Sequence, residues 1–225
     1  MNYESLLELI KKRRSIRRFK PDPIPDEYVD KIIEAARWAP SGANSQPWEF
    51  IVVKKEELRK RIIEPIMEYA NLVHKAELTR EPRLRLEWRG RPGFVHAPVF
   101  ILLCGDVRTK DAYPLLITLQ RGSSHFASSL ANAFLYMTLV ATTLGLSSQW
   151  VSASATPYVQ SIIKDLLKIP KELEIYDMLA VGYPDFEPKP RLVRAKEEMI
   201  HYDYYDEGKS RTDEKVNDFI AQLRG

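Results

Sequence analysis

Residues 124–144 constrain the fold most, because they form the longest continuous helical pattern in the chain. The run carries apolar side chains nearly all round a helix and ends at Gly145. A helix that is apolar on all sides is buried, so we expect this one at the centre of the molecule. The stretch from Phe126 to Leu146 also contains Ser128, Ser129, Asn132 and three threonines. That polarity is typical of a buried helix in a soluble protein and not of a membrane span.

Amphipathic and β-branched patterns predict further helices and strands on both sides of this run. The expected helices cover about 3–10, 26–38, 56–69, 157–167 and 216–223, and the expected strands 48–53, 97–104, 148–152 and 176–181. With 225 residues, 44% hydrophobic and 29% charged, the chain is long enough to bury one substantial core. We therefore predict a single domain over residues 1–225.

The segment after residue 184 has a different character. It is charged and contains prolines up to about residue 212, and a final amphipathic helix follows it. A structureless segment of this length is uncommon inside a compact domain. We therefore expect residues 184–225 to form an extended arm that crosses the surface of a second copy of the chain.

Ten residues near the start, 11–20, carry seven positive charges and no negative charge. Planar guanidinium groups make paired, charge-assisted hydrogen bonds to phosphate oxygens, so this basic segment can bind a small dianion. A solvated basic surface is the alternative, and nucleic-acid binding is another. The net charge of +3 is too small to favour nucleic acid. A polar, turn-rich loop at 39–47, between a predicted helix and a predicted strand, favours the dianion.

Several familiar reaction centres are excluded by pattern. The nine glycines form neither a dinucleotide fingerprint nor a P-loop, and no G-x-S-x-G elbow presents a serine nucleophile. The four histidines stand far apart, so we expect no metal site. The one cysteine, Cys104, lies in an apolar run and is interpreted as a core residue. With no disulfide possible within the chain and no signal-peptide pattern, we expect a cytoplasmic location.

Four motifs, in order over about 180 residues, resemble the FMN-dependent nitroreductase family. They are Arg13-Arg14-Ser15-Ile16-Arg17, then 39–48 (APSGANSQPW), then 145–152 (GLSSQWVS), and finally 180–184 (AVGYP) with 188–191 (PKPR). Ser147 stands where the third motif usually has glycine. Each motif alone is only suggestive, but together they are highly specific. An enzyme without catalytic side chains usually lets a cofactor perform the difficult step, which agrees with this resemblance.

The resemblance implies an α+β fold, with helices around a central, mixed but mainly antiparallel sheet. It also implies a homodimer in which the C-terminal arm is exchanged and FMN lies at the interface, lined by both chains. Residues 65–93 would form the variable lid that selects the substrate. No membrane or nucleic-acid partner is expected.

The resemblance also carries cofactor-binding roles onto individual residues. Arg13, Arg14, Ser15 and Arg17 would hold the phosphate and ribityl chain, and Lys189 and Arg191 would complete the phosphate pocket. The residues expected to meet the flavin and ribityl are Pro40, Ser41, Asn44, Gln46, Gln149, Trp150, Val151 and Ser152. Pro40 can instead merely shape its loop, and Trp48 is interpreted as a core anchor. No side chain is assigned a catalytic role, because flavin N5 is the reaction centre, and Ser152 is a candidate hydrogen-bond donor to it.

The main functional prediction is an FMN oxidoreductase that passes electrons from NAD(P)H to a nitroaromatic, quinone or enone acceptor. Alternatives are a reductive dehalogenase, an enzyme of flavin catabolism, or a flavin-binding redox protein without brisk turnover. The deiodinase branch has a Glu-x-x-x-Tyr pair, whereas Pro65 stands four residues before Tyr69 here. The flavin-destructase branch generally has an acidic residue where Ser15 stands. Both departures weaken these alternatives. The arginines in the lid are interpreted first as solvated surface.

Overall fold

A computed structural model describes residues 2–80, 93–188 and 191–224 of the chain. The chain divides into a core unit, Met1–Glu187, and an arm unit, Pro188–Gly225.

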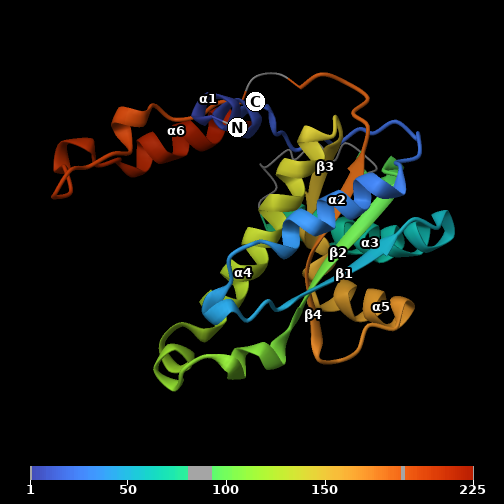
Figure 1. The fold of residues 1–225 in the computed structure, drawn as a ribbon. Helices are drawn as coiled ribbons and strands as arrows, with labels where there is room; N and C mark the ends of the chain where they lie inside the picture. The colour runs from blue at the N-terminus through green and yellow to red at the C-terminus, as the bar shows by residue number, and fades with distance from the viewer. Residues whose placement is uncertain (1, 81–92, 189–190, 225) are drawn as a thin grey trace. The chain divides into compact units, whose positions relative to one another are not determined.

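One antiparallel sheet of four strands organises the core unit (Figure 1). The strands are β1 (Trp48–Val53), β2 (Val99–Asp106), β3 (Ser147–Val151) and β4 (Leu173–Gly182), in the order β1-β2-β4-β3. All three strand pairs are antiparallel. Among the described residues, parallel pairing occurs only at an isolated bridge between Ser15 and Ser148. The α+β fold with a mainly antiparallel sheet is therefore confirmed.

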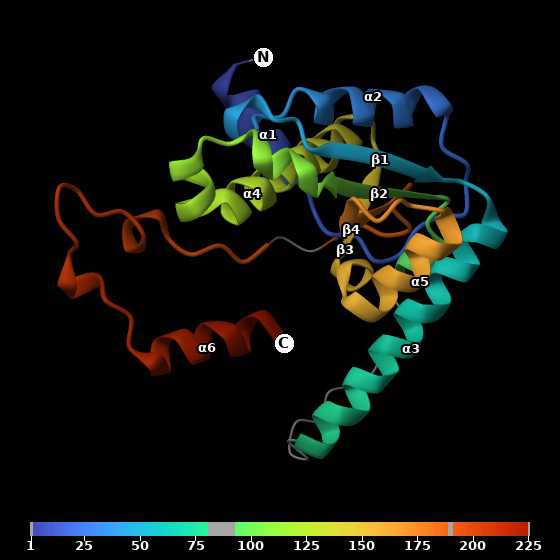
Figure 2. The same ribbon diagram turned by 90° about the horizontal axis from the view of Figure 1, so that it is seen from below.

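Helices cover both faces of this sheet. On one face lie α2 (Asp26–Arg37) and α4 (Leu115–Thr143), and on the other lie α3 (Glu56–Arg80) and α5 (Pro157–Leu167). Figure 2 shows α2 on one side of β1 and β2, with α3 and α5 on the opposite side. The sheet thus separates two apolar cores, and the central strands β2 and β4 contribute side chains to both. This alternation is the physical reason that these strands read as nearly continuous apolar runs.

The long apolar helix takes its predicted central position. Ala133, Phe134, Met137 and Ala141 of α4 are fully buried in the first core. Within the described residues, α4 is the one helix long and apolar enough to cross a membrane, and it is the packed helix of this core. It begins at Leu115, nine residues before the predicted start, because Gly122, Ser123 and Ser124 continue the helix instead of interrupting it.

Helix α3 extends further than its apolar pattern predicts. It runs from Glu56 to Arg80, with the buried Pro65 inside it. After Tyr69 the helix projects Leu72, Val73 and Leu78 into solvent, so no buried stripe marks this part in the sequence. The first sixteen residues of the predicted lid, 65–80, are therefore helical, whereas 81–92 lie outside the described residues.

A β-bulge interrupts the pairing of β2 with β4. Leu103 pairs with Asp177 and Cys104 pairs with Ile175, so Tyr176 is an extra residue on β4. Because of this extra residue, the side chains of Tyr176 and Asp177 both lie on the α4 side of the sheet. The residues before and after them in the chain, Ile175 and Met178, point to the other side, into the second core. Bulges re-aim side chains in this way and are frequent beside functional sites.

The first helix and the arm unit have little core of their own. Helix α1 (Tyr3–Lys12) packs against α4 but buries none of its residues and exposes Tyr3, Leu6 and Ile10. The arm unit contains two short 3-10 turns and α6 (Asp213–Arg224). The described part of the arm exposes Tyr202, Tyr204 and Tyr205. The division at Glu187 lies three residues after the predicted start of the arm, and exchange with a second copy stays a prediction.

Candidate functional site

The basic segment is held across the ends of β3 and β4. The backbone N–H of Ile16 donates to the carbonyl oxygen of Ser148 at 3.0 Å, and that of Lys20 donates to Tyr183 at 2.9 Å. The side chains of Ile16 and Phe19 are buried in the second core and fix the segment to the sheet. The charged residues between and before these anchors consequently remain at the surface beside β3.

Gly93 fixes the position of Arg17. A Cβ atom at Gly93 would lie 1.0 Å from the Arg17 carbonyl oxygen, so no other residue type fits there without moving one of the two backbones. The Arg17 side chain is exposed, and among the described residues it makes no ion pair. Arg13 and Arg14 are half-buried and have contacts of their own, and the Ser15 side chain is exposed.

Arg18 differs from its basic neighbours, because it is engaged by the residues that follow β4. Its Nε lies 3.9 Å from Asp185 Oδ2, and its guanidinium lies 4.9 Å from the centre of the Phe186 ring. The backbone N–H of Asp185 also donates to the Arg18 carbonyl oxygen at 3.1 Å. Arg18 therefore contacts the residues that follow β4, whereas the exposed Arg17 guanidinium makes no ion pair within the described part of the chain.

The predicted site residues of the third motif lie on β3 and just after it. Gln149 and Val151 are on the side of the second core, Trp150 is on the side of α4, and Ser152 is exposed at the start of a 3-10 turn, Ser152–Ala155. The Gln149 Oε1 atom is buried and accepts no hydrogen bond from any described residue. A buried, unsatisfied acceptor costs about 1–3 kcal/mol, and such groups mark functional positions or missing ligands.

The polar loop of the second motif is strained and is tied to α4. Ala43, Asn44 and Gln46 all have positive φ angles, at 49°, 53° and 44°, a conformation that costs non-glycine residues free energy. Within the loop, the Gln46 N–H donates to Ser41 Oγ at 3.1 Å. Backbone strain of this kind is commonly found at ligand-binding sites.

Two polar side chains of α4 support this loop. The Gly42 N–H donates to Ser129 Oγ at 3.1 Å, and Asn132 Nδ2 donates to the Pro40 carbonyl oxygen at 3.1 Å. Ser129 is buried and in turn donates to the His125 carbonyl oxygen. Sequence reasoning did not assign Ser129 and Asn132 to the site, although both are polar residues in an otherwise apolar helix, which was the available signal.

The structure brings the predicted residues together in two groups and not in one. Arg13, Arg14, Ser15 and Arg17 join β3 through the Ser15–Ser148 bridge. Pro40, Ser41, Asn44 and Gln46 join α4 through the loop contacts described above. Arg191 is exposed in the arm unit, and Lys189 lies outside the described residues.

A buried carboxylate lies beside β3 that the sequence pattern did not single out. Asp177, on the bulge of β4, accepts a hydrogen bond from Trp150 Nε1 at 2.5 Å and is only 8% exposed. Burial raises the pKa of Asp177 to about 6, and the hydrogen bond from Trp150 opposes this increase. Trp150 in turn lies against Phe134, with 4.1 Å between ring centres.

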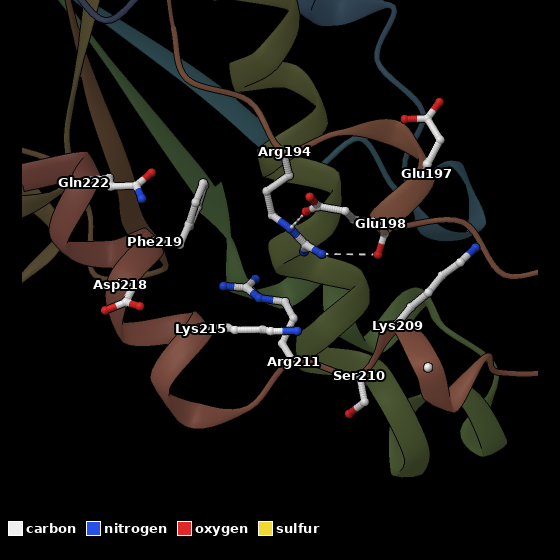
Figure 3. A pocket seen from close by; sticks show the side chains of 11 residues that line it. Arg194, Glu197, Glu198, Lys209, Ser210, Arg211, Lys215, Asp218, Phe219 and Gln222 are labelled. Atoms are coloured by element: carbon white, nitrogen blue, oxygen red, sulfur yellow. Dashed lines mark hydrogen bonds and ion pairs between the residues drawn. The ribbon is translucent and has the colours of Figure 1, made fainter.

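A cavity of about 520 Å³ lies in the arm unit, and none of the predicted site residues lines it (Figure 3). Arg194 lies 3.6 Å from the Glu198 carboxylate, and Arg211 lies 5.4 Å from the Phe219 ring centre. These cations are thus engaged within the arm. Among the described residues, no group of histidine, cysteine and carboxylate side chains could hold a metal ion.

Comparison with known proteins agrees with this arrangement. The model of the Nitroreductase family matches residues 10–183. An iodotyrosine deiodinase of Thermotoga neapolitana is 30% identical over 204 residues, covering 89% of this chain and 98% of that protein. An iodotyrosine deiodinase of Rattus norvegicus is 31% identical over 196 residues, and the match spans 82% of this chain and 64% of the rat protein.

Solved structures give the same result. A BluB-like flavoprotein of Clostridium difficile has a TM-score of 0.71 and 27% identity, covering 88% of this chain and 98% of that one. An oxidized iodotyrosine deiodinase bound to FMN and 3-iodo-L-tyrosine has a TM-score of 0.65 and 28% identity, covering 89% and 100%. The family match extends from the basic segment through β4. On the matched residues and the shared fold, the chain belongs to the Nitroreductase family.

Proposed function

We propose that the protein is an FMN-dependent oxidoreductase that takes electrons from NAD(P)H and passes them to a small acceptor such as a nitroaromatic, quinone or enone. The observation that carries this proposal is the basic segment bonded to β3 next to the unsatisfied Gln149 amide oxygen. Membership of the Nitroreductase family and the FMN-bound relative support it.

The residues beside β3 fit the polar half of FMN. Arg13, Arg14 and Arg17, with the Ser15 hydroxyl, offer donors for a phosphate dianion, and hydrogen bonds to charged groups contribute about 1.5–3 kcal/mol each. Gln149 Oε1 is an acceptor that the described protein residues leave unsatisfied. A ribityl hydroxyl would satisfy it, because a hydroxyl group donates as well as accepts. Riboflavin lacks this dianion, so it could not make these phosphate contacts.

FMN, when bound, supplies the electron and hydride transfer, and the protein supplies binding and orientation. Arg13, Arg14, Ser15 and Arg17 would anchor the phosphate, and Gln149 would orient the ribityl chain. Ser152, which is exposed after β3, would donate to flavin N5 through its hydroxyl or its backbone N–H. The NAD(P)H donor and the acceptor would use the same face in turn, as in a ping-pong reaction.

A homodimer would complete the site. The loop at 40–46 is fixed on α4 and not on β3, so in this proposal it meets the cofactor of the second chain. Exposed apolar residues of α1, namely Tyr3, Leu6 and Ile10, and the exposed tyrosines of the arm supply surface for such an assembly. The proposal also keeps the cytoplasmic location expected from a chain with one buried cysteine.

The visible absorption spectrum of the purified protein tests the cofactor. We expect yellow protein that releases about one FMN per chain on heating, as one site per chain requires. Arg17→Ala should be largely flavin-free, whereas Arg37→Ala, an exposed arginine on α2, should keep its FMN. Colourless protein that takes up no added FMN would exclude the proposal. Stopped-flow reduction with NADH and with NADPH then distinguishes a working oxidoreductase from a flavin-binding protein without brisk turnover.

A reductive deiodinase is the second candidate, because the relatives include iodotyrosine deiodinases that match 82–89% of this chain. In the predicted lid of this chain, Tyr69 is half-buried on α3, and Glu68 accepts a hydrogen bond from the Tyr158 hydroxyl at 2.8 Å. Pro65 replaces the expected glutamate. Release of iodide from 3-iodo-L-tyrosine by the reduced protein would favour this candidate, and reduction of quinones without iodide release would favour the first. Formation of a flavin breakdown product would indicate the flavin-catabolic alternative.

A further inference from the structure

Asp177 is a buried carboxylate whose one side-chain hydrogen-bond partner among the described residues is Trp150. It is 8% exposed, and its Oδ2 accepts the Trp150 indole N–H at 2.5 Å. Trp150 is 41% exposed, so the indole is the more accessible of the two groups. An apolar residue at position 177 would avoid the cost of burying a carboxylate. The carboxylate therefore lies at a position where its burial costs stability.

The β-bulge in β4 places the Asp177 carboxylate next to the Trp150 side chain of β3. Regular alternation along β4 would place Tyr176 and Asp177 on opposite faces. The extra residue between the Leu103–Asp177 and Cys104–Ile175 pairs places both on the α4 face. Asp177 thus meets the Trp150 side chain across the sheet, although the register partner of Trp150 is Leu179.

The indole is fixed from three sides. Its ring lies 4.1 Å from Phe134 of α4 and 6.2 Å from Tyr176 of β4, between ring centres, and Asp177 accepts its N–H. Trp150 stands between Gln149 and Val151 and two residues before Ser152, so the indole adjoins the backbone that carries these residues.

We propose that Asp177 is a positioning residue for the cofactor-facing strand β3, acting through its hydrogen bond to Trp150. This inference rests on the proposed FMN function. When ionised, Asp177 accepts a charge-assisted hydrogen bond, which is roughly twice as strong as a neutral one. Trp150 and the backbone from Gln149 to Ser152 are then held firmly. When protonated, Asp177 holds them less firmly, so cofactor binding becomes weaker at acidic pH.

Among the described residues, no charged group shifts the pKa of Asp177. On β4 its neighbour is Tyr176, whose pKa is raised by burial and by the Asp177 charge. Opposite it, β2 presents Leu103, and α4 presents Phe134 beyond the indole. The pKa of Asp177 is set by burial, which raises it, and by Trp150, which lowers it. A pH response of Trp150 near pH 6 is therefore assignable to Asp177.

Nuclear magnetic resonance of the Trp150 indole N–H tests the contact directly. The resonance is assigned with Trp150→Phe, which keeps an aromatic ring and removes the donor. In the wild-type protein we expect it to titrate with a midpoint near pH 6, and in Asp177→Asn we expect no titration. An indole resonance that does not respond to pH around this value, or that responds equally in Asp177→Asn, overturns the proposal.

Titration of FMN into flavin-free protein tests the consequence. Loss of a charge-assisted hydrogen bond predicts FMN binding about tenfold weaker in Asp177→Ala, with a smaller change in Asp177→Asn. Asp30→Asn, an exposed aspartate on α2, should bind FMN as the wild type does. Unchanged affinity in Asp177→Ala overturns the positioning role.

A double-mutant cycle separates this role from general destabilisation. In the Trp150→Phe background, Asp177→Asn should change FMN affinity by less than about twofold, because the shared hydrogen bond is already absent. A full effect in that background would mean that Asp177 acts elsewhere. Wild-type protein that binds no FMN at all would refute the proposed function, whereas the indole titration would still report on the Asp177–Trp150 contact.

Discussion

The backbone N–H of Ile16 donates to the carbonyl oxygen of Ser148 at 3.0 Å, joining residues that are 132 positions apart in the chain. This contact, with the buried side chains of Ile16 and Phe19, places the basic segment beside the strand that carries Gln149, Trp150 and Ser152. The first and third sequence motifs therefore lie next to each other.

Gly93→Ala should release the basic segment. The new Cβ would lie 1.0 Å from the Arg17 carbonyl oxygen, so one of the two backbones must move. We expect weaker FMN retention and a loss of about 1–3 kcal/mol in the free energy of unfolding, as for other overpacked positions. Flavin content after gel filtration and chemical denaturation measure the two effects.

Gly122→Ala is the matched control for this change. Gly122 lies inside α4, and a Cβ there would make ordinary contacts of 3.8 and 3.9 Å. Alanine should stabilise the helix by about 0.5–1 kcal/mol. If Gly93→Ala retained FMN as fully as Gly122→Ala, the placement of Arg17 beside Gly93 would be irrelevant to the cofactor.

Gln149→Leu should affect stability and cofactor binding in opposite directions. The substitution removes a buried acceptor that has no partner among the described residues, so flavin-free protein should become more stable by about 1 kcal/mol. FMN binding should weaken, because the ribityl chain loses its acceptor. Thermal unfolding of the flavin-free protein and FMN titration give the two values.

Gln160→Leu provides the contrast. Gln160 Oε1 accepts the Ile175 N–H at 2.6 Å, so its loss leaves a buried donor unsatisfied and should destabilise the protein by about 1–3 kcal/mol. A Gln149→Leu protein that is destabilised as much as Gln160→Leu would show that Gln149 has a structural partner.

Asp177 should make stability fall as the pH rises through about 6. Its pKa in the folded protein is raised by burial from 3.8 to about 6, so the folded state binds its proton more tightly than the unfolded state does. The resulting stability is fully present below the unfolded pKa of 3.8 and is lost above about pH 6, and it amounts to at most about 3 kcal/mol.

Asp177→Asn isolates this contribution, because asparagine does not titrate. Relative to the wild type, the variant should gain stability between pH 4 and pH 7, by denaturant unfolding at several pH values, since 3.8 and about 6 bound the transition. A constant difference across this range would mean that Asp177 has an ordinary pKa in the folded protein.

The sequence predicted the elements well where one apolar face is buried, and less well elsewhere. Both ends of the strand at 48–53 agree with the prediction, because its β-branched and aromatic residues are bounded by Pro47 and Lys54. The last turns of α3 project from the core, so the sequence shows no apolar stripe there that would predict a helix. The first turns of α4 were missed because Leu115, Leu116 and Leu119 are exposed and three small residues follow.

The candidate site was predictable only where the residues belong to a motif. Arg17 and Gln149 were identified by resemblance, but Gly93 depends on a close approach between distant backbones that no local pattern encodes. Asp177 depends on a bulge, and one extra residue in a strand is invisible to an alternation rule. Ser129 and Asn132 were visible as polar residues in an apolar helix, but the loop they bind could not be deduced.

Ser129→Ala should loosen the loop at 40–46. The substitution removes the acceptor of the Gly42 N–H, in a loop where Ala43, Asn44 and Gln46 already have positive φ angles. We expect a loss of about 1 kcal/mol in stability and weaker FMN binding. Ser128→Ala, an exposed neighbour on the same helix, should change neither. Equal behaviour of the two variants would show that the loop does not depend on α4.

Ser152→Ala should change how the bound flavin divides its two electrons. If the Ser152 hydroxyl donates to flavin N5, its loss should alter the separation between the first and second one-electron reduction potentials, measured by spectroelectrochemistry. Ser154→Ala is the appropriate control, because Ser154 is buried and its hydroxyl donates to the Val151 carbonyl oxygen at 2.8 Å. That variant should lose stability while keeping the wild-type separation. An unchanged separation in Ser152→Ala would assign the N5 contact to the backbone N–H, and a change confined to Ser154→Ala would show that the position of the turn matters more than either hydroxyl.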